Sequence, residues 1–225
     1  MTAMTHTAAS GITVRGLTKR FGRDTGLTDV DVTVAGGGFT LITGAAGSGR
    51  STLIRCVTGV YRPDAGRVTL RLDGHDEIDV TKADPRAVAW LRGHHIASFD
   101  GPLAAAPQLP AVSAVARAAR RDQTAAVAAL TRLRAEHLAS VPVGRLRPAE
   151  RSTVALAAAL SAGRRFVVLD EPENSAEPAA VRRWIQRAAR AGAAVIATGP
   201  AESALAAIAT TTGELRKGRI QWRTR

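Results

Sequence analysis

Two stretches of the chain carry residues suited to phosphate chemistry. The first, residues 44–52, reads GAAGSGRST and lies between an apolar run at 39–43 and a helix-like run at 53–57. A glycine-rich turn from a buried strand into a helix lets backbone N–H groups converge on phosphate oxygens, and the helix N-terminus adds its positive end. The sequence therefore predicts a phosphate-binding loop, in which the Ser51 hydroxyl is placed to ligate Mg²⁺.

One position of this loop departs from the pattern G-x-x-x-x-G-K-[ST], because Arg50 stands where the pattern has Lys. Arginine keeps the positive charge, but its planar fork is bulkier than an ammonium group and does not replace it isosterically under the β- and γ-phosphates. We therefore expect weakened nucleotide binding. The predicted contacts in the loop are Gly44, Gly47, Ser48, Gly49, Arg50, Ser51 and Thr52.

The second stretch, residues 166–172, reads FVVLDEP. Its four apolar residues predict a strand inside a sheet, and two carboxylates follow at the carboxyl end, where open α/β sheets bind ligands. In a nucleotide hydrolase the first carboxylate orients Mg²⁺ and the second polarises the attacking water. The pattern therefore predicts Asp170 as a metal residue and Glu171 as the catalytic residue. A plain exit from a strand is the alternative, and the phosphate loop upstream disfavours it.

The remaining patterns indicate the elements that position these residues. Alternation at 12–14 and 30–34 predicts half-buried antiparallel strands, and 67–72 predicts another strand. Continuous apolar runs at 166–169 and 193–198 are typical of parallel strands covered on both faces. The last residues, 214–222, predict a hairpin with its turn at Lys217-Gly218.

Helical patterns fill most of the segment between the two motifs. We expect helices at 86–92, 112–121, 124–138 and 149–160. In the third, one face carries Val127, Leu130, Leu133 and Leu138, which predicts a core-facing amphipathic helix. A further helix is expected after Pro178, with Trp184 in its apolar stripe as a core residue rather than one that stacks on a ligand.

Composition limits the class of protein. With 225 residues, 45% of them apolar and 22% charged, the chain is expected to be globular, apart from a polar, flexible tail at 1–10. It has no run of eighteen apolar residues and no signal-peptide pattern, so we expect a cytoplasmic protein without a membrane span. A single cysteine, Cys56, excludes an internal disulfide and is interpreted as a small core residue.

The formal net charge of +12 favours polyanionic partners. The excess is almost all arginine in an alanine-rich chain, and no motif with interleaved aromatic residues accompanies it. Nucleic-acid binding therefore rests on charge alone and is not expected.

Together these motifs resemble an ATP-binding cassette (ABC) ATPase over residues 12–222: a phosphate loop, the strand ending in Asp170-Glu171-Pro172, the sequence KRFG at 19–22 and a helical insertion. The resemblance implies an α/β P-loop NTPase fold with a RecA-like core, an antiparallel β subdomain and a helical subdomain at about 93–160, within one ATP-binding domain at 11–225. It implies ATP and Mg²⁺ as cofactors and Phe21 stacking on adenine. A turn residue that caps the small sheet is the alternative role for Phe21.

Three connecting segments, 61–66, 72–80 and 110–115, are similar to those of PhnL-type ABC subunits, which are associated with phosphonate C–P lyase. This resemblance implies a dimer or heteromer with another ABC-type subunit, and a phosphonate C–P lyase complex as the larger partner.

The chain departs from the ABC pattern at the signature L-S-G-G-[QE]. Residues 146–150 read LRPAE. In the family, the serine and glycine amides grip the γ-phosphate held by the opposite protomer. Arg147 has no short hydroxyl and Pro148 has no N–H, so we expect that half of the composite site to be lost.

Two further family residues are missing. Gly199-Pro200 stands where the switch histidine is expected, and Asp100-Gly101 stands at the glutamine, with Gln108 displaced by several residues. Residues 175–177, SAE, are a partial version of the family's S-x-L-D loop. The histidines are interpreted as surface or helical-subdomain residues: His6, His75, His94, His95 and His137.

Three functions stay open at this point. The first is an ABC-type ATP-binding protein with weak or absent hydrolysis, in which Glu171 acts on water and Ser51 and Asp170 hold Mg²⁺. The second is a non-catalytic scaffold that partners a complete ABC ATPase. The third, the nucleotide-binding subunit of a membrane importer, is disfavoured by the missing glutamine, because that loop meets the membrane domain in the family.

Overall fold

Two β-sheets and six α-helices build the described part of the chain, residues 10–22, 24–72 and 77–223 of a computed structural model. The smaller sheet is antiparallel, in the order β2 (Asp24–Ala35), β1 (Gly11–Phe21), β4 (Ala65–Arg71), β5 (Glu77–Asp79). The larger has the order β10 (Arg219–Arg223), β9 (Thr211–Arg216), β3 (Phe39–Thr43), β8 (Ala194–Gly199), β7 (Phe166–Leu169), β6 (Ile96–Phe99). All its strand pairs are parallel except β10 with β9.

The central strands of the larger sheet are buried along their whole length. Every residue of β3, β7 and β8 is buried, which confirms the prediction from their continuous apolar runs. Because these strands run parallel, the phosphate loop after β3 and the carboxylates after β7 lie at the same edge of the sheet.

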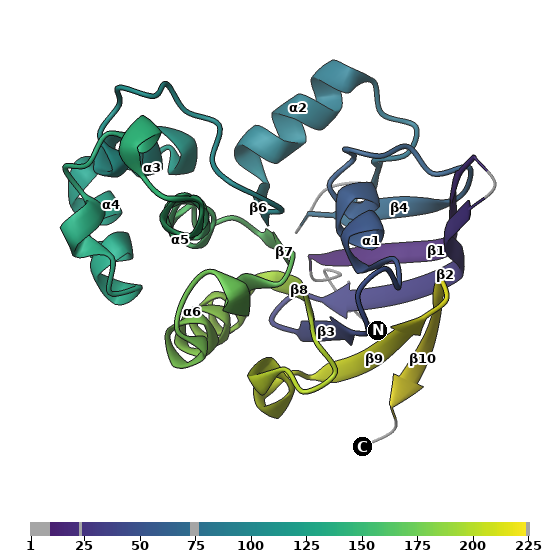
Figure 1. The fold of residues 1–225 in the computed structure, drawn as a ribbon. Coiled ribbons are helices and arrows are strands. Elements are labelled where there is room, and N and C mark those ends of the chain that lie inside the picture. Colours follow the sequence, from purple (N-terminus) through teal and green to yellow (C-terminus); the bar gives the residue numbers. More distant parts are fainter. Residues whose placement is uncertain (1–9, 23, 73–76, 224–225) are drawn as a thin grey trace, which may run out of the picture.

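Helix α1 (Arg50–Val57) lies between the two sheets. Its buried side chains, among them Leu53 and Ile54, join one apolar core with residues of β1, β2, β4 and the central strands of the larger sheet. Packing on two sides fixes the helix whose first turn follows the phosphate loop. Figure 1 shows α1 in front of the strands.

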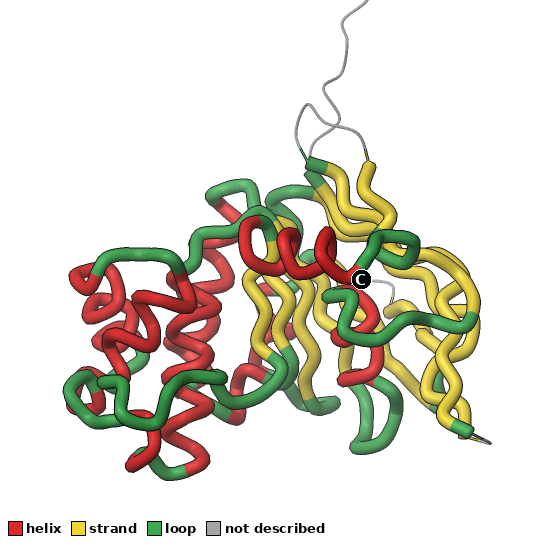
Figure 2. The backbone as a smooth tube through the Cα atoms, turned by 90° about the horizontal axis from the view of Figure 1, so that it is seen from above, coloured by secondary structure: helices red, strands yellow, loops and turns green. Residues whose placement is uncertain are grey.

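Three helices form a separate cluster beyond the β6 edge of the larger sheet: α3 (Ala111–Ala119), α4 (Gln123–Arg132) and α5 (Pro148–Ser161). In Figure 2 they lie on one side of the molecule and the strands on the other. They enclose a second core with one face of the sheet. Helices α2 (Pro85–His94) and α6 (Pro178–Arg190) flank the larger sheet (Figure 1).

The boundaries of the helical segment differ from the prediction of about 93–160. Strand β6 falls inside that range and pairs in parallel with β7, so it belongs to the sheet. The helix expected at 124–138 ends at Arg132, because Arg134 takes a left-handed φ of 57° and a 3₁₀ turn follows at Glu136–Leu138. Val127 is 44% exposed, so its predicted place on the core face was wrong. Small alanines take that face: Ala126 and Ala129 are buried beside Leu130.

Two predictions near the N-terminus also need correction. The strand expected at 12–14 is longer than predicted, because β1 continues through residues 19–21. Residues 1–9 of the expected tail lie outside the described residues, but Ser10 is buried, and its carbonyl accepts a hydrogen bond from the Gly36 N–H at 2.6 Å.

The predicted C-terminal hairpin is confirmed. Lys217 and Gly218 both have positive φ, 46° and 77°, as a two-residue hairpin turn with the twist of its strands requires. The Gly218 N–H donates to the Ser48 carbonyl at 3.2 Å, so this turn supports the phosphate loop from behind. Within the described ranges, no helix is long and apolar enough to span a bilayer.

Candidate nucleotide-binding site

The loop after β3 has the curled backbone that a phosphate cradle needs. Gly44, Gly47 and Gly49 have φ of 157°, 74° and 107°, a region that suits glycine and few other residues. At Gly49 a Cβ atom would lie 2.2 Å from the Gly26 carbonyl oxygen, so glycine is also required there for space. Near Gly47 a Cβ would meet nothing within 4 Å, which leaves the mouth of the loop open.

Helix α1 begins directly at the loop, and no side chain caps its N-terminus. Its first-turn N–H groups therefore lack intrahelical partners and point toward the loop's concavity. This arrangement suits an anion. The Ser48 hydroxyl is buried without a hydrogen-bond partner among the described residues.

A cavity of about 640 Å³ opens in front of the loop. It brings together seven of the residues predicted from sequence: Phe21, Gly47, Gly49, Arg50, Ser51, Thr52 and Glu171. Three others, Gly44, Ser48 and Asp170, do not line it, and Gly26 and Ala46, which were not predicted, do. The roles of the predicted residues stay predictions, but most of them share one wall.

Arg50 is turned toward protein groups rather than toward the cavity mouth. Its side chain is 9% exposed, and one terminal nitrogen, Nη2, lies 2.6 Å from Oε1 of Glu171. The other, Nη1, donates to the Gly199 carbonyl, a buried contact. The guanidinium therefore joins the phosphate loop to the ends of β7 and β8.

Glu171 is held from three sides. Its second carboxylate oxygen, Oε2, accepts a hydrogen bond from Asn174 Nδ2 at 2.6 Å, and its backbone is left-handed, with φ 46°. Its N–H donates to Oγ1 of Thr198 at 3.0 Å, and that hydroxyl donates to Oδ1 of Asp170 at 2.5 Å. Thr198 thus fixes both carboxylate residues from the neighbouring strand.

Neither Asn174 nor Thr198 was predicted as part of the site. A polar residue at the end of an otherwise apolar strand is a signal for Thr198. Asn174 ends the 3₁₀ turn Pro172–Asn174, which no sequence pattern predicted, so only the fold brings it to Glu171.

Phe21 lies at the edge of the cavity and is 44% exposed. Its ring meets Tyr61 edge to face, with centroids 5.5 Å apart, and Lys19 Nζ lies 5.6 Å from its centroid. An exposed aromatic ring at the end of β1 is available for stacking, and both roles considered for Phe21 fit this position.

Comparison with known proteins agrees with this geometry. The family model described as ABC transporter matches residues 27–174, a range that contains both the phosphate loop and the two carboxylates. The chain belongs to the ABC transporter family. Its fold is that of a P-loop NTPase.

Several ABC importer proteins are similar in sequence. The phosphonates import ATP-binding protein PhnC 1 of Natronomonas pharaonis is 31% identical over 185 residues, 79% of this chain and 76% of that protein. The Fe(3+) ions import ATP-binding protein FbpC of Streptomyces coelicolor is 32% identical over 93% of this chain but only 60% of its own length. The sulfate/thiosulfate import ATP-binding protein CysA of Ralstonia nicotianae is 30% identical over 78% of this chain and 48% of its own length.

Solved ABC cassettes share the fold. The ATP-binding cassette MJ0796, in a dimeric post-hydrolysis state bound to ADP and Pi, matches 95% of this chain and 98% of its own with a TM-score of 0.81 and 18% identity. A nucleotide-free cassette from an ABC transporter matches with a TM-score of 0.72 and 20% identity.

The residues expected from sequence at the signature position form a helix cap. Arg147 precedes α5, its N–H donates to Oε2 of Glu150 at 2.8 Å, and its guanidinium pairs with Oε1 at 2.5 Å. These contacts with Arg147 lower the pKa of the Glu150 carboxyl. The Arg147 side chain is 82% exposed, so it stabilises the helix start at the surface.

The other ABC positions are occupied by different contacts. Asp100, at the place of the glutamine, lies 3.8 Å from Arg55 Nε. At the place of the switch histidine, the Gly199 carbonyl accepts from Arg50. His94 and His95 lie beside the Trp90 ring, His137 lies in a 3₁₀ turn, and His6 and His75 fall outside the described residues.

The site fits ATP and Mg²⁺ in part. The glycine loop and the free N–H groups suit phosphate, and Ser51 offers an oxygen ligand of the kind that Mg²⁺ takes alongside water and phosphate, whereas Asp170 does not line the cavity. In the described ranges, no three His, Cys, Asp or Glu residues gather as a metal cluster. The positive charge that should neutralise the phosphates does not fit, because the Arg50 guanidinium is paired with Glu171.

Proposed function

We propose that this ABC protein is an ATP-binding subunit that binds Mg-ATP weakly and hydrolyses it slowly or not at all. One observation carries the proposal: the Arg50 guanidinium is paired with Glu171 and bonded to the Gly199 carbonyl. The Arg50 side chain is buried and that of Glu171 is 32% exposed, so separating the pair would leave the arginine as a buried charge without its partner.

The residues have distinct roles in this proposal. The loop N–H groups and the N-terminus of α1 bind phosphate oxygens, Phe21 stacks on the base, and Ser51 and Asp170 hold Mg²⁺. When bound, the ion neutralises charge on the phosphates. Glu171 would orient the attacking water, but Arg50 and Asn174 already occupy its two oxygens.

Several groups that would stabilise the transition state of hydrolysis are replaced, and their effects on the rate add up. Removing one donor that stabilises transition-state charge costs about 10²- to 10³-fold in rate. Here the loop lysine, the signature hydroxyl and amide, and the switch histidine are all replaced, by Arg50, Arg147-Pro148 and Gly199. We therefore expect turnover to be close to abolished while phosphate binding survives.

Calorimetry with Mg-ATP on the wild type and on Arg50→Lys tests the binding half of this proposal. A lysine ammonium is too compact to span both Glu171 and Gly199 and is free to face phosphate, so the variant should bind about tenfold or more tightly than the wild type. Arg86→Lys is the matched control, since Arg86 is exposed on α2 outside the cavity, and it should bind like the wild type.

Equal affinity in wild type and Arg50→Lys would show that Arg50 does not limit binding. No binding by either, with both folded by circular dichroism, would overturn the proposal and favour the non-catalytic scaffold.

The importer subunit is the second candidate, and the similar proteins favour it. PhnC 1, FbpC and CysA are each described as import ATP-binding proteins. This support outweighs the missing glutamine, since Asp100 still occupies that loop. Co-expression with the membrane domains of an ABC importer tests it: recovery in the detergent-solubilised complex supports the importer, and exclusive recovery in the soluble fraction contradicts it.

We also propose that this chain pairs with a complete ABC subunit, which provides an intact signature opposite this chain's phosphate loop. The support is that Arg147 and Pro148 leave this chain unable to offer the usual signature contacts. The link to phosphonate metabolism is a finer proposal, supported by PhnC 1 at 31% identity and by the similarity of three connecting segments to PhnL-type subunits. Co-purification with C–P lyase subunits tests it.

A further inference from the structure

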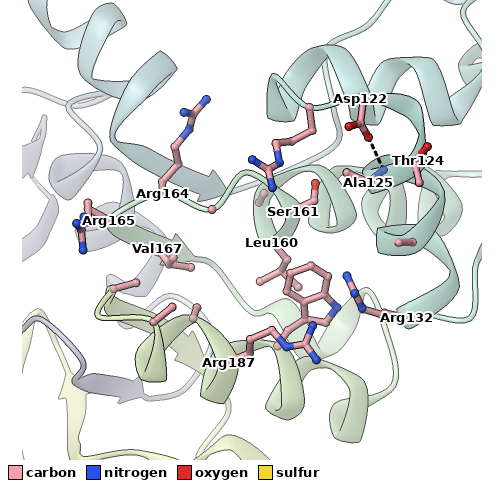
Figure 3. Close-up of a pocket in the computed structure, with 18 residues that line it drawn as sticks. Asp122, Thr124, Ala125, Arg132, Leu160, Ser161, Arg164, Arg165, Val167 and Arg187 are labelled. Atoms are coloured by element: carbon pink, nitrogen blue, oxygen red, sulfur yellow. Dashed lines mark hydrogen bonds between the residues drawn. The ribbon is translucent and has the colours of Figure 1, made fainter.

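A second cavity in the described part of the chain lies away from the nucleotide site. It has a volume of about 780 Å³ and is bounded by α4, the end of α5, the start of β7 and α6 (Figure 3). Val167 lines this cavity at the start of β7, whereas Glu171, which lines the nucleotide cavity, follows the end of β7. The two cavities therefore lie at opposite ends of the same strand.

Positive charge dominates the lining of this cavity. Five arginines contribute to its wall: Arg121, Arg132, Arg164, Arg165 and Arg187. The acidic member of the lining, Asp122, is already engaged, since its Oδ1 accepts the Ala125 N–H at 2.7 Å and caps α4 (Figure 3).

Part of this positive charge is not balanced by a carboxylate in the described part of the chain. Among the described residues, Arg121, Arg132 and Arg187 form no ion pair with a carboxylate. Arg164 donates to the Gly93 carbonyl at 2.9 Å, and its pKa is lowered by burial and by repulsion from Arg120 and Arg121. An anion in the cavity would relieve this repulsion.

The indole of Trp184 forms part of the wall between the two helices. The guanidinium of Arg132 lies over its ring, 5.3 Å from the centroid, and Figure 3 shows Arg132 and Arg187 reaching into the same space from α4 and α6. The indole Nε1–H is buried and has no hydrogen-bond partner within the described ranges. A buried donor without a partner is unfavourable, and an acceptor atom that displaced the flexible Arg132 side chain would satisfy it.

The rest of the wall is made mostly of small apolar residues. Six alanines, Ala125, Ala128, Ala159, Ala188, Ala191 and Ala193, are joined there by Leu160, Gly163 and Val167, and the polar members are Thr124 and Ser161. The volume is in the range of sites for metabolite-sized ligands and too large for a bare inorganic anion. Guanidinium groups match the oxygens of phosphate in pairs, and several of them favour a ligand with more than one negative charge.

We propose that this arginine-lined cavity between α4 and α6 binds an organic phosphate, a phosphate monoester of metabolite size, with Arg132 and Arg187 on the phosphate and Trp184 Nε1 as a further donor. The site is separate from the nucleotide cavity and does not depend on the function proposed above. A concave site of this size favours a small molecule over a nucleic-acid backbone.

The indole signals of the protein provide a direct readout, because the chain has three tryptophans. In ¹H–¹⁵N spectra of the full chain, the Nε1–H signal of Trp184 is assigned as the one lost in Trp184→Phe. Titration with ribose 5-phosphate should shift this signal to saturation, while ribose, which lacks the charge, should leave it unchanged.

Arginine variants connect the response to the cavity. Arg132→Gln and Arg187→Gln should each weaken the binding of ribose 5-phosphate about tenfold, the loss expected for a charge-assisted hydrogen bond. Arg190→Gln is the matched control, since Arg190 is exposed on α6 but does not line the cavity, and it should bind within about twofold of the wild type.

Three results would overturn the proposal: no shift of the Trp184 signal with ribose 5-phosphate, equal loss of affinity in Arg190→Gln, or inorganic phosphate binding as tightly as the ester. A shift of the same signal by single-stranded DNA but not by ribose 5-phosphate would also overturn it and assign the surface to nucleic acid. Because Trp184 does not line the nucleotide cavity, failure here leaves the proposed ATP binding untouched.

Discussion

The guanidinium of Arg50 is the group that most changes the chemistry of the nucleotide site. A lysine at this position ends in a point charge, whereas the arginine fork bonds two acceptors at once, here Glu171 and the Gly199 carbonyl. Arginine at this position therefore differs from lysine in the shape of its charged group and also in its partners, which are protein acceptors instead of phosphate oxygens. The sequence predicted the weakened contact with phosphate but not the new partner, because β7 and β8 bring that partner close only in the fold.

Thr198 and Asn174 show the same limit. Both bond the predicted carboxylates, yet their positions in the sequence, 28 residues after Asp170 and three after Glu171, form no motif. Gly47, Ser51 and Glu171 could be predicted because backbone curvature and strand ends restrict their residue types, whereas Phe21 was predicted from the resemblance to ABC ATPases.

Cys56 is expected to be unreactive in the folded chain. Burial raises the pKa of its thiol to about 11, well above the usual value for a cysteine. A disulfide reagent at pH 8 should label the native chain far more slowly than the chain in urea, because the thiolate is the reactive form. Equal labelling rates would show that the thiol is accessible.

The same shift makes a prediction for stability. A raised pKa in the folded state means that the unfolded chain ionises first, so stability should fall as pH rises from about 9 to about 11. In Cys56→Val this contribution to the decline should be absent. The free energy of unfolding of each protein is measured by urea denaturation at several pH values. An equal decline in both proteins between pH 9 and pH 11 would contradict this cause.

The helices were predicted best where periodicity and caps coincide. Pro178 begins α6 as expected, and Val181 and Ile185 are buried in its apolar stripe. The expected helix at 124–138 was too long, because the left-handed turn at Arg134 carries neither glycine nor asparagine. Trp184 was expected in the core, yet it is partly exposed and lines two cavities, a position that depends on how α4 packs against α6.

The N-cap of α4 can be tested separately from the charge of the cavity. Asp122→Ala removes the acceptor of the Ala125 N–H and should lower the free energy of unfolding by about 1 kcal/mol, measured by urea denaturation. Asp122→Asn keeps an acceptor at the cap and should cost less. An equal loss in both variants would show that charge rather than capping sets the contribution of Asp122.

The whole molecule has the fold of an ABC cassette, and the contacts of Arg50 are those from which we propose an altered nucleotide site. Two cores, one on each side of the larger sheet, hold the phosphate loop and the carboxylates at one edge. The fold and the edge were predictable from apolar runs and their order. The arginine-lined cavity at the other end of β7 was not, because its arginines come from segments far apart in the sequence.

The fold also determines where part of the net charge of +12 lies. From the sequence, the charge is known only as a total. In the structure, five of the arginines line one cavity between α4 and α6. The same arginines that suggested a general attraction to polyanions therefore support a local site. This local arrangement, rather than the total charge, is what a ligand can recognise.

Steady-state hydrolysis of Mg-ATP by the purified wild-type chain tests the central claim most directly, with Glu171→Gln as the background control. With Arg50 bound to Glu171 and the signature and switch residues replaced, we expect a rate below about 0.01 s⁻¹ and indistinguishable from that of the control. A turnover of about 1 s⁻¹ or more that disappears in Glu171→Gln would contradict the account, because it would require Glu171 to act on water despite the Arg50 ion pair.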